Sequence, residues 1–224
     1  MTTVVILAAG KQTRWERNMG AGTRKQLLDV GGETILSRMI RQCNDRGAVP
    51  IAMTIHKEIK EAIRFEDRAT WMTPRFYEYT VSTFQSAPWG EKRTIVLLGD
   101  VVYSKTVMNR IFECAAPIKV FGSIYEIFAV SMSARVYRGV QDACTAAYEH
   151  ALLGGKGTMR KFYQAYCGLD LGGDAMETKV LDPVCWIADY TRDVDTPEDY
   201  RDLRIKVVNG GLLDDLKGGQ DALA

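Results

Sequence analysis

Five short apolar runs recur along the chain and alternate with helix-like segments. The runs cover residues 4–9, 49–55, 93–99, 118–121 and 126–133. The helix-like segments between them lie near residues 33–46, 57–64, 80–86, 104–115 and 135–153. Continuous apolar strands that alternate with helices are typical of a mostly parallel sheet buried on both faces. The pattern therefore predicts an α/β fold, and in such folds ligands bind beyond the carboxyl ends of the strands.

The chain beyond residue 153 is less regular. Residues 154–182 contain the turn-rich stretches "GGKG" and "GLDLGGD", and we interpret this segment as an insertion or a cover over the site. The sequence "DTPEDY" then predicts a helix with Thr196 as N-cap, Pro197 as first residue and Asp199 three residues after the cap. We expect a single domain over residues 1–207, with no internal repeat, followed by a loosely held tail over residues 208–224.

Composition narrows the class of protein. The 224 residues suffice for one domain with a well-buried core, and 29 basic against 28 acidic residues leave a net charge of +1. This balance argues against a nucleic-acid or membrane binder that relies on overall charge. No apolar run approaches the ~20 residues of a membrane span, and the first run resembles a strand rather than a signal peptide. The five scattered cysteines, none in a CxxC pair, favour reduced thiols and a cytoplasmic location.

The stretch after the first strand concentrates positive charge locally. The strand ends in Ala8, Ala9 and Gly10, whose small side chains let a ligand approach the backbone closely. Arg14 and Lys25 can then converge on a polyanion, the arginine as a planar fork and the lysine as a point charge. The alternative is a mobile, solvated basic loop. Composition alone favours neither interpretation.

The spacing of these residues resembles the signature of the nucleotidyltransferases that activate sugar phosphates and related phospho-compounds. That signature is an apolar strand, L-A-[AG]-G-x-G-[TS]-R, a spacer, then a lysine followed by Gln or Pro and a short apolar stretch. The matching residues are Leu7, Ala8, Ala9, Gly10, Thr13, Arg14, Lys25, Gln26, Leu27, Gly31 and Leu36. The departures are Gln12 at the second glycine and Arg24 at the small residue or proline before the lysine. The resemblance implies a Rossmann-like (GT-A-like) three-layer sandwich around a mostly parallel, mixed β-sheet.

The same resemblance implies a binding site for a nucleoside triphosphate. Arg14 and Lys25 are the expected catalytic residues, because they would hold the β- and γ-phosphates. The expected nucleotide-binding residues are Leu7, Ala8, Ala9, Gly10, Lys11, Gln12, Thr13, Ser82 and Thr83. Alternatively, Lys11 is a solvated surface lysine with no role in binding. The side chain of Gln12 either forces an ordinary negative φ that shifts the loop, or donates a hydrogen bond that the family takes from the backbone.

Two acidic motifs are candidates for a metal site. Asp100 directly follows the apolar run at 93–99, and its alternative role is a turn or a cap on the helix that follows. Asp193 and Asp195 precede the predicted last helix. The resemblance implies that Asp100 and Asp195 bind the metal, with Asp193 as the weaker alternative. Carboxylate oxygens supplied singly suit Mg²⁺, whereas the two histidines are far apart in sequence and do not favour zinc.

These parts predict one reaction. An ionised phosphate of the acceptor attacks the α-phosphorus of a nucleoside triphosphate, and pyrophosphate leaves. Because the nucleophile is already an anion, no general base is required, and catalysis consists of positioning and charge neutralisation with Mg²⁺ bridging the reacting phosphates. The expected partners are the triphosphate and a phosphorylated small molecule, with no nucleic acid and no membrane. The small size of the protein is compatible with a homodimer.

The acceptor pocket is less well specified. Lys156, Arg160 and Lys161 in "GGKGTMRKFY" are candidates for binding the acceptor's phosphate, and Trp186 is a candidate for the pocket wall. The alternatives are the polar face of a helix for the basic residues and core packing for the tryptophan. The sequence does not identify the base or the acceptor.

Three other functions share parts of this pattern. A glycosyltransferase that uses a nucleotide sugar would explain the DxD sequence at residues 193–195. That motif normally follows a mid-chain strand, and such enzymes do not need a pair of cations for a triphosphate. A non-catalytic nucleotide-binding module would keep the fold, although Lys25 and Asp100 are both present. Molybdenum-cofactor guanylyltransferases share the opening motif and remain an alternative acceptor class.

Overall fold

A seven-stranded sheet forms the centre of the molecule, with the strand order β3-β2-β1-β4-β7-β6-β8. The computed structural model describes residues 2–10, 12–20, 22–63, 68–123, 126–173 and 183–208, without the side chains of residues 13, 14 and 206–208. The strands of the sheet are β1 (Thr2–Leu7), β2 (Ile51–Met53), β3 (Thr70–Met72), β4 (Arg93–Leu98), β6 (Ile118–Gly122), β7 (Ile127–Ser133) and β8 (Val184–Trp186). Lys11, the side chains of Thr13 and Arg14, and the predicted tail from residue 209 onward lie outside the described residues.

The sheet is mixed, as predicted, because one strand opposes the others. β1 lies parallel to both β2 and β4, β3 lies parallel to β2, and β8 lies parallel to β6. β7 runs antiparallel to its neighbours β4 and β6. The amino end of β7 therefore lies at the sheet edge where β1 and β4 have their carboxyl ends. This edge is where ligands bind in open α/β sheets.

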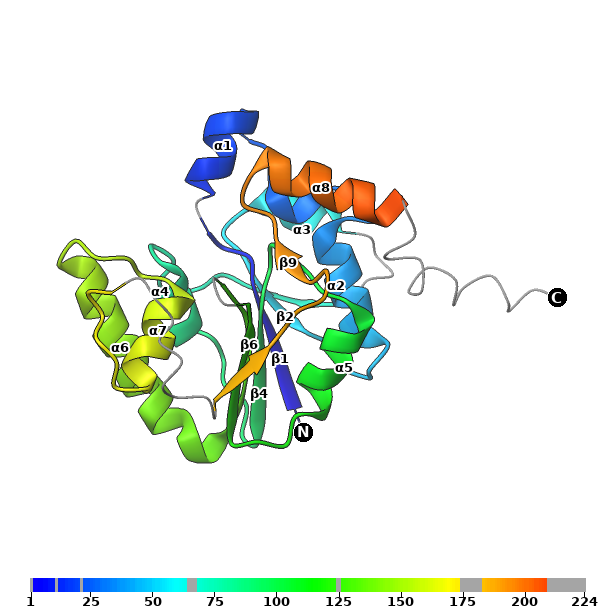
Figure 1. The fold of residues 1–224 in the computed structure, drawn as a ribbon. Coiled ribbons are helices and arrows are strands. Elements are labelled where there is room, and N and C mark those ends of the chain that lie inside the picture. The colour runs from blue at the N-terminus through cyan, green and yellow to red at the C-terminus, as the bar shows by residue number, and fades with distance from the viewer. Residues whose placement is uncertain are drawn as a thin grey trace.

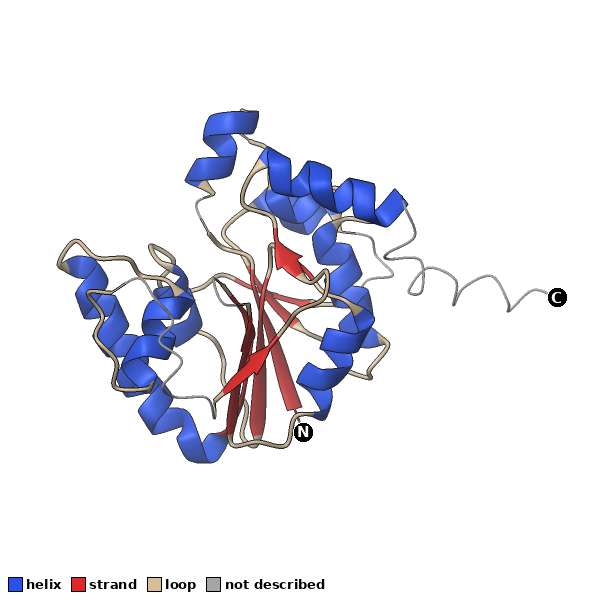
Figure 2. Cartoon of the chain, viewed as in Figure 1, coloured by secondary structure: helices blue, strands red, loops and turns tan. Residues whose placement is uncertain are grey.

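Helices cover both faces of the sheet, which gives the predicted three-layer sandwich (Figures 1 and 2). The helices are α1 (Thr13–Met19), α2 (Ile35–Asn44), α3 (Lys57–Ala62), α4 (Thr80–Gln85), α5 (Lys105–Glu113), α6 (Tyr137–Leu152), α7 (Met159–Tyr166) and α8 (Pro197–Val208), with the 3₁₀ helices η1 (Lys25–Leu27) and η2 (Ala134–Val136). In the part of the chain described, no helix is long and apolar enough to cross a membrane.

Alternation along β1 divides the core between the two faces. Val5 and Leu7 pack in the cluster that includes residues of α4, α6 and α7. Val4 and Ile6 pack in the cluster that includes residues of α2, α3 and α5. Successive side chains of a strand point to opposite faces, so a strand that is apolar at every position is buried on both. This accounts for the continuous apolar run at residues 4–9.

Two helices were absent from the sequence prediction. The segment at 154–182, which we interpreted as irregular, contains α7, whose residues Met159, Phe162 and Tyr163 are buried at helical spacing. The stretch interpreted as a cationic loop contains α1, which is held by the fully buried Trp15. Trp15 packs with Leu203 of α8 and lies edge-on to Tyr200. Its partners come from the far end of the sequence, so local pattern gives no sign of them.

Strands β1 and β4 approach so closely at their carboxyl ends that Gly99 has no room for a side chain. The Gly99 N–H donates to the Leu7 carbonyl at 2.9 Å. A Cβ at Gly99 would lie 2.7 Å from that carbonyl oxygen and 3.0 Å from Ala8 Cβ. A Cβ at Gly10, by contrast, would meet no atom within 4 Å.

We expect Gly99→Ala to destabilise the fold by about 1–3 kcal/mol, the usual cost of forcing a methyl group into a packed site. Gly10→Ala is the matched control, because its added methyl group enters open space. The free energy of unfolding of both variants can be measured by urea denaturation. Equal stability of Gly99→Ala and the wild-type protein would show that the two strand ends separate easily.

Candidate functional site

A short antiparallel ribbon brings the two acidic motifs together. It pairs β5 (Val101–Val102), which follows Asp100, with β9 (Arg192–Asp193). The N–H of Val194 donates to the carbonyl of Asp100 at 3.1 Å and extends the pairing by one bond. Asp100 and Asp195 therefore face the same edge of the sheet, although they lie far apart in sequence.

Lys25 lies between these two carboxylates. Its Nζ is 2.7 Å from Asp100 Oδ2 and 2.8 Å from Asp195 Oδ1, and the residue is only 5% exposed. Burial by itself would lower the pKa of Lys25, but the charges and hydrogen bonds of the two carboxylates outweigh it and raise the pKa above its usual value. The side chain is therefore a buried, permanently charged ammonium group.

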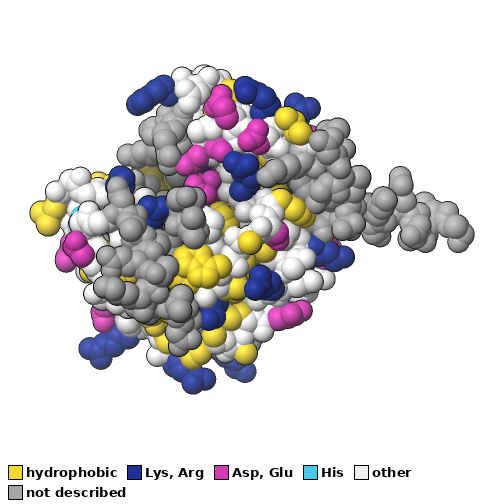
Figure 3. Space-filling view, in the orientation of Figure 1, with side chains coloured by type: hydrophobic (Ala, Val, Ile, Leu, Met, Phe, Trp, Pro, Cys, Tyr) yellow, Lys and Arg dark blue, Asp and Glu magenta, His cyan; other side chains and the backbone are white. Residues whose placement is uncertain are grey.

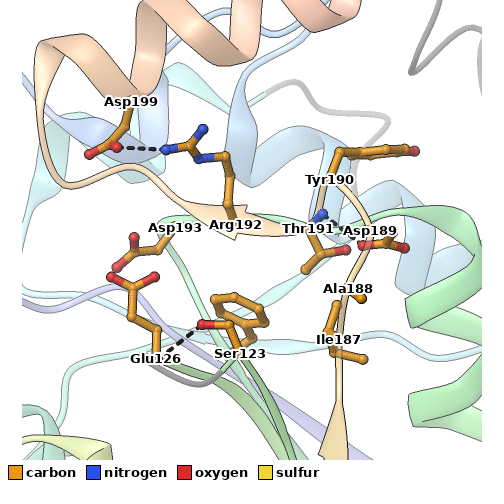
Figure 4. A pocket seen from close by; sticks show the side chains of 11 residues that line it. Ser123, Glu126, Ile187, Ala188, Asp189, Tyr190, Thr191, Arg192, Asp193 and Asp199 are labelled. Carbon is orange, nitrogen blue, oxygen red and sulfur yellow. Dashed lines mark hydrogen bonds and ion pairs between the residues drawn. The ribbon is translucent and has the colours of Figure 1, made fainter.

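Glu126 and Asp193 add two further carboxyl groups beside this contact (Figure 4). One oxygen from each of Glu126, Asp193 and Asp195 lies within 4.8 Å of the others. Burial, followed by the charges of Asp100, Asp195 and Glu126, raises the pKa of Asp193 to about 9. Burial is also the main cause of the raised pKa of Glu126. Asp100 and Asp195 share the single positive charge of Lys25, and the oxygen-only donor set of the whole group fits a hard divalent cation.

Sequence reasoning missed Glu126 as a site residue. It precedes β7, and the prediction of a mostly parallel sheet directed attention to residues that follow strands. Because β7 is antiparallel, the residue before it reaches the same edge as Asp100. Glu126 and Asp193 also line a small cavity of about 320 Å³, together with Arg192 and Asp199 (Figure 4).

Asp199 fixes the backbone around Asp195. Its Oδ2 accepts from the backbone N–H of Thr196 at 2.8 Å and of Asp195 at 3.2 Å, and its Oδ1 pairs with Arg192 at 2.7 Å. In return the Asp199 N–H donates to Thr196 Oγ1, which confirms the predicted capping of the last helix. Burial opposes ionisation, but the Thr196 hydrogen bonds and the Arg192 charge lower the pKa of Asp199. Ser104, rather than Asp100, caps α5.

A cavity of about 920 Å³ lies against this group of charges. Figure 3 shows several acidic side chains close together, with a basic side chain beside them, in the upper half of the face drawn. The predicted site residues that line the cavity are Leu7, Ala9, Gly10, Gln12, Lys25, Thr83, Asp100, Lys156, Arg160, Lys161 and Asp195. Trp15, Tyr77, Glu78, Tyr79, Glu126 and Asp193 are among the lining residues that sequence analysis did not assign to a nucleotide or acceptor pocket. The structure thus brings the end of β1, the cationic Lys25 and the start of α7 around one space.

Other predicted residues lie apart from the cavity lining. Ala8 is fully buried, with its N–H bonded to Met53 at the end of β2. Ser82 is also buried, and its hydroxyl accepts from the N–H of Tyr79 as part of the cap of α4. Trp186 packs against the core cluster on the α6 face of the sheet.

The wall opposite Lys25 is built from the turn before α7. Gly157 packs closely against Tyr79, since a Cβ at Gly157 would lie 2.4 Å from Cγ of that side chain. Its carbonyl accepts from the N–H of Val81 at 3.1 Å. Lys161, also a candidate for phosphate binding, is 3% exposed and donates to the carbonyls of Leu171 and Gly173. Lys161 therefore ties the chain after α7 to that helix.

Gln12 adopts the backbone conformation of a glycine. Its φ of 52° and ψ of 30° lie in the left-handed region, at the N-cap position of α1. Of the two alternatives for Gln12, the one in which a side chain forces an ordinary negative φ is wrong. For a residue with a Cβ this conformation costs roughly 1–2 kcal/mol, so the surrounding structure must hold it.

The fold is shared with solved structures at low sequence identity. A homolog of Mycobacterium tuberculosis Rv0371c from Mycobacterium sp. strain JC1 is 21% identical, with a TM-score of 0.55 over 93% of this chain and 97% of that chain. The CTP:phosphocholine cytidylyltransferase of Streptococcus pneumoniae is 13% identical, with a TM-score of 0.60 over 91% and 98%. The inositol-1-phosphate CTP transferase of T. maritima is 13% identical, with a TM-score of 0.60 over 94% and 97%. At such identities the likeness shows the fold.

The family is shown by the sequence itself. No curated protein gives a significant match, but residues 4–166 match the MobA-like NTP transferase domain. This region is well over half of the chain and contains β1, Lys25 and Asp100, whereas Asp193 and Asp195 follow it. The chain therefore belongs to the MobA-like NTP transferase family and is a nucleotidyltransferase of the type that the opening motif indicated.

Proposed function

We propose that the protein transfers a nucleoside monophosphate from a nucleoside triphosphate to a phosphorylated small molecule, with release of pyrophosphate and dependence on Mg²⁺. The observation that carries this proposal is the Lys25 ammonium group, 2.7 and 2.8 Å from Asp100 and Asp195, beside a cavity of about 920 Å³. The volume is near the upper end of the roughly 300–1,000 Å³ typical of ligand pockets. We take residues 1–207 as the catalytic domain.

The proposed reaction exchanges one phosphorus–oxygen bond for another. An oxygen of the acceptor's phosphate bonds to the α-phosphorus, while the bond from the α-phosphorus to the oxygen that bridges it to the β-phosphate breaks. The electron pair of that bond leaves with pyrophosphate. Because the nucleophile is an anion, no side chain has to remove a proton. The role of the protein is to position the phosphates and neutralise their charge.

Lys25 and the end of β1 carry most of this role. The stretch from Ala8 to Gly10 carries only small side chains, and Ala9 and Gly10 line the cavity. We propose that the Lys25 ammonium group moves from the carboxylates to the β- and γ-phosphates when the triphosphate binds. We propose Arg14, on α1, as the second phosphate-binding cation. Thr83 is the proposed contact to the nucleoside.

The acidic group is the proposed metal site. Asp100 and Asp195 already share one cation, the Lys25 ammonium, so both carboxylates are oriented toward a common point. We propose these two as the Mg²⁺ ligands, with Asp193 and Glu126 beside them. When bound there, Mg²⁺ would act as a Lewis acid that offsets charge on the reacting phosphates.

The acceptor would lie toward the start of α7. Lys156 and Arg160 line this side of the cavity and are the proposed contacts to its phosphate. Solved structures with the same fold include enzymes named for phosphocholine and inositol-1-phosphate, which supports an acceptor that is a phosphorylated alcohol or sugar. Trp186 would influence this pocket only through the core against which it packs.

Removal of Lys25 should impair the reaction by weakening the grip on the departing phosphates. We expect Lys25→Ala and Asp100→Ala each to lower kcat/KM by about 10²–10³-fold or more, the usual effect of losing one electrostatic contact to a transition state. Pyrophosphate release is the measurement. Lys92→Ala is the control, since Lys92 is exposed and precedes β4 at the opposite end of the strand. Near wild-type turnover of either variant would contradict the mechanism.

Lys25 should also compete with a divalent cation in the nucleotide-free protein. Lys25→Met leaves Asp100 and Asp195 without their buried counter-charge, so we expect Mn²⁺ to bind this variant about tenfold or more tightly than the wild-type protein. Mn²⁺ titration followed by electron paramagnetic resonance measures the affinity without any turnover. Lys92→Met should leave the affinity unchanged. Weaker Mn²⁺ binding to Lys25→Met would argue against a cation site at these carboxylates.

Substrate identity can be tested by a matrix of purified compounds. The wild-type protein is incubated with Mg²⁺, each common ribonucleoside triphosphate or dTTP, and a panel of phosphosugars, phospho-alcohols and the molybdenum cofactor. Pyrophosphate release with one triphosphate and one phosphorylated acceptor is the expected result. Activity confined to GTP and the molybdenum cofactor would identify the alternative acceptor class. Transfer from a nucleotide sugar, without any triphosphate, would refute the proposal in favour of a glycosyltransferase.

A further inference from the structure

Gln12 and Arg24 are the two positions at which the sequence departs from the opening motif. Gln12 contacts the segment that carries Lys25, and Arg24, directly before Lys25, ties that segment to α1 and α3. We propose that they form a brace that fixes this segment against the start of α1 and thereby positions the Lys25 ammonium. The inference rests on the proposed function, because it assigns these two residues a role in triphosphate binding. Both are positioning residues, since they act through Lys25.

Both the nitrogen and the oxygen of the Gln12 side-chain amide contact the Lys25 segment. The backbone N–H of Lys25 donates to Gln12 Oε1 at 2.9 Å. The Nε2 of Gln12 donates to Gln26 Oε1 at 2.6 Å. Lys25 and Gln26 are 5% and 2% exposed, so both hydrogen bonds are made to residues that water hardly reaches. A glycine at position 12 could adopt the same φ but could make neither bond.

One of these bonds gives the backbone N–H of Lys25 an acceptor that its own helix cannot supply. Lys25 is the first residue of η1, and the first N–H groups of a helix have no acceptor within it. Gln12 supplies that acceptor from a distant position in sequence. The carbonyl of Gln12 also accepts the N–H of Glu16 at 2.9 Å, which starts α1. One residue therefore links the start of α1 to the start of η1.

Arg24 supplies the second part of the brace. Its guanidinium group pairs with Glu16 on α1, and its Nε pairs with Glu58 on α3 at 2.7 Å. The residue directly before Lys25 is therefore held from two sides. Among the residues that the structure describes, Gln12 is the only non-glycine with a positive φ. An unfavourable backbone conformation is retained here together with two hydrogen bonds that a glycine would lose.

The consequence concerns the triphosphate rather than the acceptor. Lys25 Nζ is at the end of a long flexible side chain, and its position is set by its backbone and by its partners Asp100 and Asp195. When the ammonium moves to the phosphates, those partners no longer hold it, and the backbone becomes the main constraint. Fixing that backbone in advance reduces the freedom lost on binding. The proposed acceptor contacts, Lys156 and Arg160, come from the turn before α7 and from its first turn, not from the segment that carries Lys25.

Gln12→Ala and Gln12→Gly test the proposal through kinetics. Both remove the two hydrogen bonds, but only glycine tolerates the left-handed backbone, so Gln12→Gly is the variant expected to stay folded. We expect both to raise KM for the triphosphate by about tenfold, the effect of losing one or two buried hydrogen bonds, with KM for the acceptor within twofold of wild type. Gln85→Ala is the control, because its side-chain bond to Thr145 lies away from the site. A triphosphate KM for Gln12→Gly equal to or below the wild-type value would overturn the brace.

Amide hydrogen exchange tests the brace without any substrate. In the ligand-free protein, Gln12→Gly should raise the exchange rate of the Lys25 N–H about tenfold or more, since its acceptor is lost, while the amide of Ile6 in the centre of β1 stays protected. Unchanged exchange at Lys25 would overturn the brace whatever the activity. If none of the pairs of triphosphate and acceptor makes the wild-type protein release pyrophosphate, the proposed function fails. The hydrogen-exchange result still decides whether the brace exists.

The Gln12→Gly/Arg24→Ala double variant tests whether the two residues act together. If they form one brace, the double variant raises the triphosphate KM by less than the product of the two single effects, because the first substitution already releases the segment. If the two single effects on the triphosphate KM multiply in the double variant, Gln12 and Arg24 act independently, and the proposal that they form one brace is overturned. Arg41→Ala is the matched control for Arg24→Ala, since its ion pair with Glu33 lies outside this segment.

Discussion

The ammonium group of Lys25 is buried between two carboxylates that come from distant parts of the sequence. Such a group costs several kcal/mol to remove from water unless it is paired in good geometry. The pairing with Asp100 and Asp195, at 2.7 and 2.8 Å, therefore requires three segments to meet with little tolerance. The β5–β9 ribbon aligns the segment of Asp100 with the segment of Asp195. The Asp199 carboxylate then fixes the backbone at Asp195 by accepting its N–H.

The same contact explains why the site is poised for a further cation. Lys25 supplies one positive charge, but Asp193 and Glu126 lie beside Asp100 and Asp195. Burial, reinforced by the neighbouring carboxylates, raises the pKa of Asp193. A nucleotide that draws Lys25 toward its phosphates would leave the carboxylates unpaired. Binding of the triphosphate and of a divalent cation would then favour each other.

Local patterns in the sequence predicted the elements whose apolar residues face the sheet, and the motif predicted Lys25, Asp100 and Asp195 as residues of one site. What could not be predicted depends on partners that are distant in sequence. Trp15 holds α1 in place by packing with Leu203 of α8. Glu126 reaches the site because β7 is antiparallel to β4. Neither fact leaves a local trace in the residues concerned.

Glycine and glutamine at position 12 solve the same geometric problem differently. Glycine reaches the left-handed region without steric cost, but it loses more conformational freedom on folding and makes no side-chain contact. Gln12 accepts the steric cost and gains two hydrogen bonds to the Lys25 segment. Glutamine in place of glycine is favourable only where that segment stays in place. Arg24 holds the segment by ion pairs with Glu16 and Glu58. The two departures from the motif therefore support each other, and neither implies loss of the triphosphate site.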